Sequence, residues 1–197
     1  MKILESSLGI LMLAFVGGCS SNSVMDSPQI AQDELYRVDT PDVILKAART
    51  LMESDENVAL VSVDGKGQPR VRTVRAFLSE PNPSDRTKEM TVWVMTRDST
   101  RKVEQLRQHP QATLYFNDDA KLSYLTIMGK AVVHTDPASE KVQPFLAMEG
   151  YKEFFWPDFP KGFVMIEIQP SWIEFMGPGV KNHRQHWRPQ AVSFPIE

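Results

Sequence analysis

The sequence of 197 residues contains only one cysteine, Cys19, and no apolar run long enough to cross a bilayer. A single cysteine excludes an intrachain disulfide and a metal site built from several thiolates. The net charge is −3, so the chain lacks the basic excess that is typical of nucleic-acid-binding proteins. The serine nucleophile motif of α/β hydrolases is absent as well. What remains is a chain long enough for one domain with a proper core.

The histidines raise the question of a metal site. Of the four histidines, His183 and His186 lie three residues apart. Such a spacing occurs in zinc sites, but these two stand in a basic segment without a neighbouring acid or thiol. We therefore predict no metal site.

Cys19 stands in an informative context. Lys2 precedes a short apolar run at residues 8–16, and Gly17 and Gly18 separate this run from the cysteine. A basic start, a short apolar run and small residues before the cleavage point are typical of a secretory signal. Because the cysteine follows the small residues directly, the segment looks like a bacterial lipobox. We predict a lipoprotein signal peptide at residues 1–18 and a lipidated Cys19 that anchors the chain to a membrane.

The alternative is an ordinary secretory signal with an accidental cysteine. Residues 19–38, polar after the cysteine, are interpreted as the lipidated residue and a flexible tether. Ser20 is what outer-membrane lipoproteins usually show after the cysteine. We therefore expect an exported protein on the periplasmic face of the outer membrane, if the host is Gram-negative. The folded domain is predicted at residues 39–176, followed by a basic tail at 177–197.

Short apolar stretches alternate with turn residues through the predicted domain. Strands are predicted at residues 57–63, 69–78, 92–95, 111–116, 122–134, 163–168 and 171–176. Helices are predicted from Pro41, from about Ser99 to Gln108, and over residues 136–149. Most neighbouring strands are connected as hairpins. This favours a mainly β fold with helices, a six-stranded antiparallel split barrel with peripheral helices.

Several finer features follow from the same pattern. The first helix is expected to bury one stripe of apolar residues, namely Val43, Ile44, Ala47, Leu51 and Met52. Asp64-Gly65-Lys66-Gly67 predicts a hairpin turn, and Gly129 in a long strand predicts a bulge or sharp bend. Residues 79–89 are predicted to be a polar loop, and the tail to be irregular.

Residues 91–110 organise the prediction of function. An apolar strand at residues 92–95 turns into an amphipathic helix that Pro110 stops, with Asp98 or Ser99 as the expected N-cap. Thr100, Arg101 and Lys102 then stand in the first helical turn, where free N–H groups and the helix dipole favour an anion. The pattern predicts a phosphate site, and the alternative is a solvated first turn whose charges bind nothing specific.

The strand at residues 69–78 carries three arginines, Arg70, Arg72 and Arg75. In a regular strand Arg70 and Arg72 share one face, whereas Arg75 takes the other. An exposed face explains them without a ligand. The functional alternative is that Arg72 meets an anion.

Three motifs give the chain a likeness to a known family: residues 67–74 (GQPRVRTV), residues 95–102 (MTRDSTRK), and the spacing from Lys102 through Pro110 to Gly129-Lys130. In this order they resemble the flavin-binding split-barrel proteins of the pyridoxamine 5′-phosphate oxidase superfamily. The likeness to the general-stress-protein branch is closer. It covers about residues 40–176.

The resemblance implies a homodimer that holds flavin mononucleotide (FMN) at its two-fold interface. Arg72, Thr100, Arg101 and Lys102 would surround the phosphate, and strand residues would line the ring. The full set of cofactor-binding residues that the resemblance implies is Arg72, Thr73, Val74, Arg75, Met95, Thr96, Thr100, Arg101, Lys102, Tyr124 and Arg188.

The chain also departs from the family pattern. Phe77 stands where the oxidases place a lysine for the substrate phosphate, Tyr124 replaces a flavin-binding glutamine, and Met176 falls where a tryptophan is expected. The tail residues Arg184, His186 and Arg188 echo the family's R-x-H-x-R motif with a spacing that differs by two. These departures argue against pyridoxamine phosphate oxidation and leave flavin binding in place.

Two classes of function follow. The first is an FMN-dependent oxidoreductase that acts on a small molecule and whose catalytic residues are unassigned. The second is a non-catalytic binding or stress-related module of the same fold, which holds a flavin or another anionic ligand.

Overall fold

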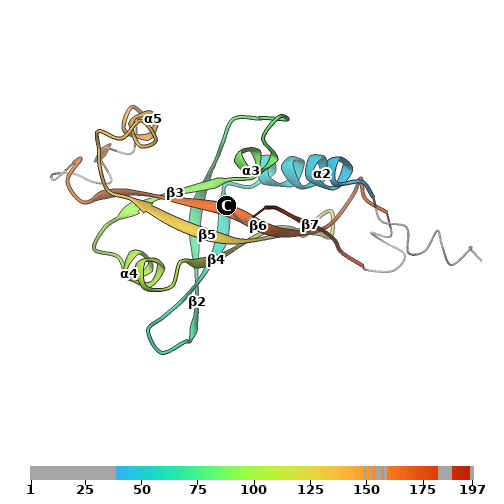
Figure 1. Cartoon of the computed structure of the whole chain (residues 1–197), viewed down its shortest axis with the longest axis horizontal. Coiled ribbons are helices and arrows are strands. Elements are labelled where there is room, and N and C mark those ends of the chain that lie inside the picture. The colour runs from blue at the N-terminus through green and yellow to red at the C-terminus, as the bar shows by residue number, and fades with distance from the viewer. Residues whose placement is uncertain are drawn as a thin grey trace, which may run out of the picture. The chain divides into compact units, whose positions relative to one another are not determined.

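The computed structural model describes residues 39–148, 150, 152–153, 157, 159–181 and 188–195 (Figure 1). The predicted signal peptide, Cys19 and the tether lie outside the described residues, and so do Arg184 and His186 of the tail. In the part that is described, no helix has both the length and the hydropathy that crossing a membrane requires.

Six antiparallel strands form a closed barrel, and a seventh strand pairs outside it. The strand order is β3-β2-β1-β4-β5-β6-β7, and the pairing of β3 with β6 closes the ring. The elements of the barrel are β1 (Asn57–Val63), β2 (Pro69–Leu78), β3 (Val92–Arg97), β4 (Gln111–Asp118), β5 (Ser123–His134) and β6 (Phe163–Met176). The predicted fold, mainly β with a six-stranded barrel and peripheral helices, is confirmed.

The β1–β2 hairpin sets the register of the arginine strand. The Asp64 carboxylate accepts hydrogen bonds from the backbone N–H of Lys66 at 2.9 Å and of Gln68 at 3.0 Å. Arg70 donates to the other carboxylate oxygen at 2.8 Å. A turn closed in this way pins the strand pairing, in which Leu60 lies opposite Arg72. The predicted hairpin turn is confirmed, and it places Arg72 beside the inward residues of β1.

The β5–β6 pair turns a corner at Gly129. The register shifts between Met128 and Gly129, and a Cβ atom on Gly129 would stand 2.0 Å from the carbonyl oxygen of Gln169. The predicted bulge is therefore confirmed. The prediction of two strands at 163–168 and 171–176 is wrong, because β6 continues through Pro170. The irregular pairing at this point removes the need for the ladder bond that a proline cannot donate.

The helix α2 (Pro41–Ser54) packs against the barrel (Figure 1). It begins after Thr40 as predicted, but its buried stripe is shifted from the expected one. Val43 is exposed, and the stripe consists of Ile44, Leu45, Ala48, Leu51 and Met52. These residues join the inward side chains of the strands in one core. The helix closes off apolar surface that the barrel leaves open.

Three segments outside the barrel differ from the predictions. The polar loop at 79–89 ends in a short helix, α3 (Arg86–Glu89). Among the described residues of the helix predicted at 136–149, only those of α5 (Gln143–Leu146) form an α-helix. Pro144 lacks the N–H that a longer helix would need there and is tolerated only in a first turn. The tail, predicted to be irregular, contains β7 (Gln190–Ser193), which pairs with β6.

Candidate anion-binding site

The helix α4 (Arg101–Gln108) begins directly after β3 at one end of the barrel. Thr100 is its N-cap, not Asp98 or Ser99, so the prediction of the cap is wrong by one or two residues. The Thr100 hydroxyl donates to the carbonyl of Arg97 at 2.8 Å, and no side chain caps the helix. The first N–H groups of α4 therefore stay available to a ligand, and Arg101 and Lys102 occupy its first two positions.

Arg72 reaches from β2 under the same helix. Its guanidinium donates to the Ser62 hydroxyl at 2.6 Å and to the Gln105 side-chain oxygen at 2.8 Å. Ser62 is fully buried on the inward face of β1, and its hydroxyl also donates to Gln105 at 2.7 Å. Because neutral groups hold the guanidinium in place, its full positive charge remains uncompensated.

Lys102, in the first turn of α4, contacts the end of β3. Its ammonium group donates to the Thr96 hydroxyl at 2.9 Å, and that hydroxyl lies 3.4 Å from the hydroxyl of Thr100. Thr96 is buried at the end of β3. The strand β3 and the first turn of α4 thus bring two hydroxyls and one ammonium group together.

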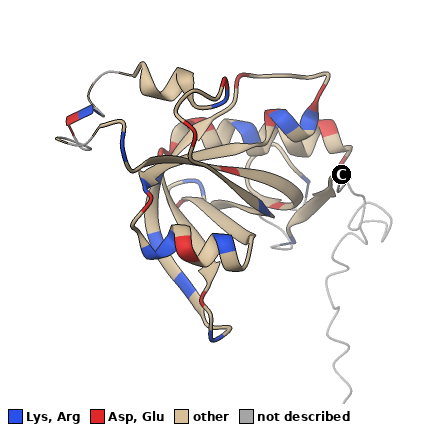
Figure 2. Cartoon of the chain, turned by 60° about the vertical axis from the view of Figure 1, so that its left-hand side comes forward, with Lys and Arg blue, Asp and Glu red and all other residues tan. Residues whose placement is uncertain are grey.

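The cations of this cluster disfavour one another's charge. Burial lowers the pKa of Arg72, and the positive charges of Arg101 and Arg70 lower it further. Burial likewise lowers the pKa of Lys102, with a further contribution from Arg72. Arg70 is paired with Asp64. Across the part of the chain that the structure describes, no carboxylate forms an ion pair with Arg72, Arg101 or Lys102. Figure 2 shows basic residues along α4 and β2.

The other residues of β2 that were predicted to bind the cofactor lie on both faces of the sheet. Val74 is 8% exposed and points into the core, so only its backbone can face a ligand. Thr73 and Arg75 are exposed on the outer face of the sheet. Met95 of β3 is half-buried on the outer side of the barrel, where it packs against a second apolar cluster.

The contacts of Tyr124 place it away from the cation cluster. Tyr124 lies on the outer sheet face, where its ring stacks on Tyr115 with centroids 5.8 Å apart and its hydroxyl donates to Glu174 at 3.0 Å. The pKa of Tyr124 is raised to about 12, mainly by burial and to a smaller extent by the hydrogen bond to Glu174. Arg188 stands in the coil before β7. Their predicted roles at a flavin remain predictions.

Ser62 and Gln105 are site residues that the sequence analysis missed. Ser62 had a detectable signal, because it is the one polar residue among the inward positions of β1. Gln105 had none, since a glutamine on an amphipathic helix is ordinary.

The residues present fit a phosphate monoester. Three cations, the hydroxyls of Thr96 and Thr100 and the free N–H groups of a helix start converge at one end of the barrel. A doubly charged phosphate would relieve the repulsion among the cations and accept charge-assisted hydrogen bonds from them.

Comparison with known proteins gives the fold a family. The pyridoxamine 5′-phosphate oxidase profile matches residues 44–177. A protein from Clostridium acetobutylicum related to general stress protein 26 of B. subtilis is 22% identical, with a TM-score of 0.59, and the match covers 79% of this chain and 97% of that one.

Two other solved structures share the fold. A pyridoxamine 5′-phosphate oxidase-related, FMN-binding protein from Nostoc punctiforme is 13% identical over 82% of this chain and 100% of that one, with a TM-score of 0.54. A heme-binding protein from Mycobacterium smegmatis is 14% identical over 80% of this chain and 60% of that one, with a TM-score of 0.55. A search of curated proteins finds no significant match. Because the profile spans the whole barrel, the chain belongs to the pyridoxamine 5′-phosphate oxidase family, as its three motifs predicted.

Proposed function

We propose that this protein binds FMN and acts as a flavin-dependent oxidoreductase on a small molecule. The observation that supports the proposal is the cluster of Arg72, Arg101 and Lys102, whose charges no described carboxylate compensates. In this proposal the phosphate lies at the start of α4, and the ring extends along the outer side of β2 and β3 past Arg75 and Met95. FMN, when bound, would supply the electron transfer, and the residues of this chain would bind and orient it.

The phosphate contributes most of the expected affinity. A hydrogen bond to a charged group stabilises by about 1.5–3 kcal/mol. We therefore expect FMN to bind at least about tenfold more tightly than riboflavin, which has the same ring but no phosphate. Titration of residues 21–197 with each flavin, followed by flavin fluorescence, measures this ratio. Equal affinities would show that the cations do not bind the phosphate.

A second candidate function is a binding module without turnover. The fold also occurs in the heme-binding protein from M. smegmatis, and heme carries carboxylates that the same cations would attract. Anaerobic mixing of the FMN-loaded protein with NADH and NADPH separates the two functions. Bleaching of the flavin absorbance supports the oxidoreductase. Tight flavin or heme binding without reduction by either donor supports the module.

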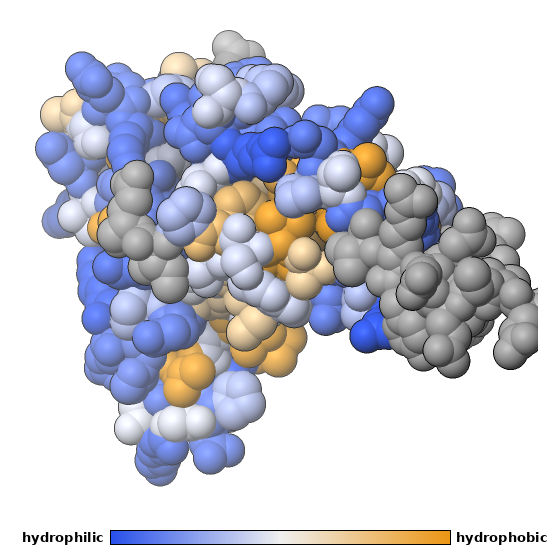
Figure 3. All heavy atoms as spheres, turned by 45° about the vertical axis from the view of Figure 1, so that its right-hand side comes forward, coloured by the Kyte–Doolittle hydropathy of each residue, from blue (hydrophilic) through white to orange (hydrophobic). Residues whose placement is uncertain are grey.

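We also propose that the protein is a homodimer. Val71, Tyr115 and Met128 are 66%, 40% and 46% exposed, and the strand registers place them on one outer sheet face. Above the β1–β2 hairpin at the lower tip of Figure 3, apolar side chains gather inside a hydrophilic border. A contiguous apolar face of this kind is typical of an interaction surface.

Charge placed on this face should separate the subunits. We expect light scattering after size-exclusion chromatography to give a dimer for the unmodified protein and a monomer for Val71→Glu. The matched control is Val43→Glu, because Val43 is also an exposed valine, 40% accessible, but lies on α2. A monomer in the unmodified protein would contradict the proposal.

The proposed location is a lipid anchor on the periplasmic side of the outer membrane. If Cys19 is lipidated, the full chain expressed in a Gram-negative host should yield a membrane-bound protein whose mass corresponds to residues 19–197 plus acyl groups. The variant Cys19→Ser should lack that added mass and leave the membrane fraction. An unlipidated mature form of the unmodified chain would contradict the anchor.

A further inference from the structure

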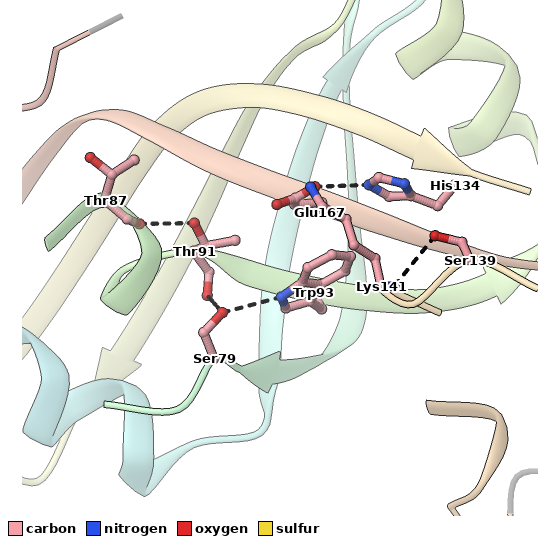
Figure 4. Close-up of polar contacts among 8 residues, drawn as sticks. All are labelled: Ser79, Thr87, Thr91, Trp93, His134, Ser139, Lys141 and Glu167. Carbon is pink, nitrogen blue, oxygen red and sulfur yellow. Dashed lines mark hydrogen bonds and ion pairs between the residues drawn. The ribbon is translucent and has the colours of Figure 1, made fainter. Parts of the chain in front are cut away.

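A second polar cluster lies on the outer side of the barrel, under the segment that carries α5. Glu167 of β6 is 7% exposed, and its Oε2 atom accepts hydrogen bonds from His134 Nε2 at 2.8 Å and from Lys141 Nζ at 2.9 Å. Figure 4 shows Glu167 and His134 facing each other beside Trp93. The cluster is made by three separate elements, β5, β6 and the segment before α5.

The Glu167 carboxylate determines which ring nitrogen of His134 carries the proton. Burial would raise the pKa of Glu167, but the hydrogen bonds from Lys141 and His134 outweigh it and leave this pKa below its ordinary value. An ionised carboxylate only accepts, so Nε2 of His134 carries the proton. Among the described residues, none is hydrogen-bonded to Nδ1 of His134. A neutral His134 therefore keeps Nδ1 as a free proton acceptor, in an orientation that Glu167 holds.

The strand register places His134 on the proposed ring side of the barrel. Met95 pairs with Met165, and Met165 pairs with His134, so the three residues form one row across β3, β6 and β5. His134 thus stands two strand spacings, roughly 10 Å, from Met95. Trp93 lies in the neighbouring row opposite Glu167, and its ring is 5.5 Å from that of His134.

Aromatic residues restrict water around this cluster. The ring of Phe145 on α5 lies 5.3 Å from Trp93 and 5.9 Å from Phe77. The side chain of His134 is only 16% exposed. The charged groups that face it are Glu167 and Lys141, and Arg75 lies on the same outer side, on β2.

We propose that His134 exchanges the substrate proton at the flavin site and that Glu167 and Lys141 are its positioning residues. The inference rests on the proposed FMN site. In the oxidation of a substrate H–C–X–H, where X is oxygen or nitrogen, the C–H hydrogen leaves with its electron pair for the oxidised flavin. The proton on X goes to Nδ1 of His134, and a C=X double bond forms. The imidazolium then returns its proton to solvent.

The test follows flavin and histidine together and needs no substrate. The flavin midpoint potential of the FMN-loaded protein is measured against pH between about 5 and 8, where histidine changes charge. The variants are His134→Gln and Glu167→Gln. The matched control is His109→Gln, because His109 caps the far end of α4. In parallel, NMR follows the His134 ring signals, assigned by their loss in His134→Gln, as FMN is added.

We expect the pH profile of the potential to change in His134→Gln and to stay as it is in His109→Gln, with FMN affinity changed by less than about threefold. Glu167→Gln should change the profile as well, and FMN should shift the His134 signals. If His134→Gln binds FMN and keeps the unmodified profile, the inference is overturned and the flavin site stands. A Glu167→Gln variant that unfolds at lower temperature but keeps the pH profile of the unmodified protein would show that Glu167 stabilises the fold and does not position His134 for proton exchange. A folded protein that binds no FMN overturns both proposals.

Discussion

Replacing Gly129 with alanine is expected to destabilise the protein by at least about 3 kcal/mol, enough to unfold a large fraction of a marginally stable domain. The new Cβ atom would stand 2.0 Å from the carbonyl oxygen of Gln169 and 2.8 Å from its carbonyl carbon. Both are backbone atoms, so no side chain can move aside. The clash lies in β5–β6, and because β6 also pairs with β3, separating these strands would open the barrel.

Urea unfolding followed by circular dichroism measures this effect. The control is Gly65→Ala in the β1–β2 turn, where the nearest atom to a new Cβ is the end of the Gln108 side chain at 3.3 Å. That side chain can rotate away, so we expect a change within about 1 kcal/mol. Similar stabilities for the two variants would mean that β6 does not approach Gly129 as closely as the structure shows.

The double variant Arg101→Ala with Lys102→Glu is expected to weaken FMN binding by at least about 150-fold. Losing hydrogen bonds from two cations costs about 3 kcal/mol or more, and each 1.4 kcal/mol is a factor of ten in affinity. The new carboxylate also repels the phosphate. Fluorescence titration at low and high salt measures the loss, and the affinity of the unmodified protein should fall as salt rises.

The control has the same change in charge at another place. Arg86→Ala with Lys88→Glu alters exposed residues of α3 and removes the surface pair of Arg86 with Asp42, which contributes little to stability. This control should bind FMN as the unmodified protein does. The site variant should unfold at the same temperature as the unmodified protein or higher, because it relieves the repulsion that, in addition to burial, lowers the pKa of Arg72 and Lys102. Unchanged FMN affinity in the site variant would exclude this cluster as the phosphate site.

The local sequence pattern was sufficient to predict most strands of the barrel. The bounds of β1 and β2 agree with the prediction because Asp64-Gly65-Lys66-Gly67 is an unambiguous turn between alternating strands. The bulge at Gly129 was predictable, since a glycine within a long strand usually marks one. The helices were harder. The predicted 136–149 helix was reduced to α5 by Pro144, and the buried stripe of α2 depends on which side the barrel contacts.

For the candidate site, residue types and their spacing along the chain were sufficient to single out Arg72, Thr100, Arg101 and Lys102. Where a strand leads directly into a helix, residues that are close in sequence are also close in space, so the local sequence is enough to place them together. That these cations lack a described carboxylate partner, and that Ser62 and Gln105 hold Arg72, were decided only when β1, β2 and α4 packed together. The same holds for His134, Lys141 and Glu167, which lie up to 33 residues apart in the chain and meet only because β5 pairs with β6. Contacts between distant segments depend on the closure of the barrel and on the pairing of strands that no tight turn connects, and no local pattern encodes those.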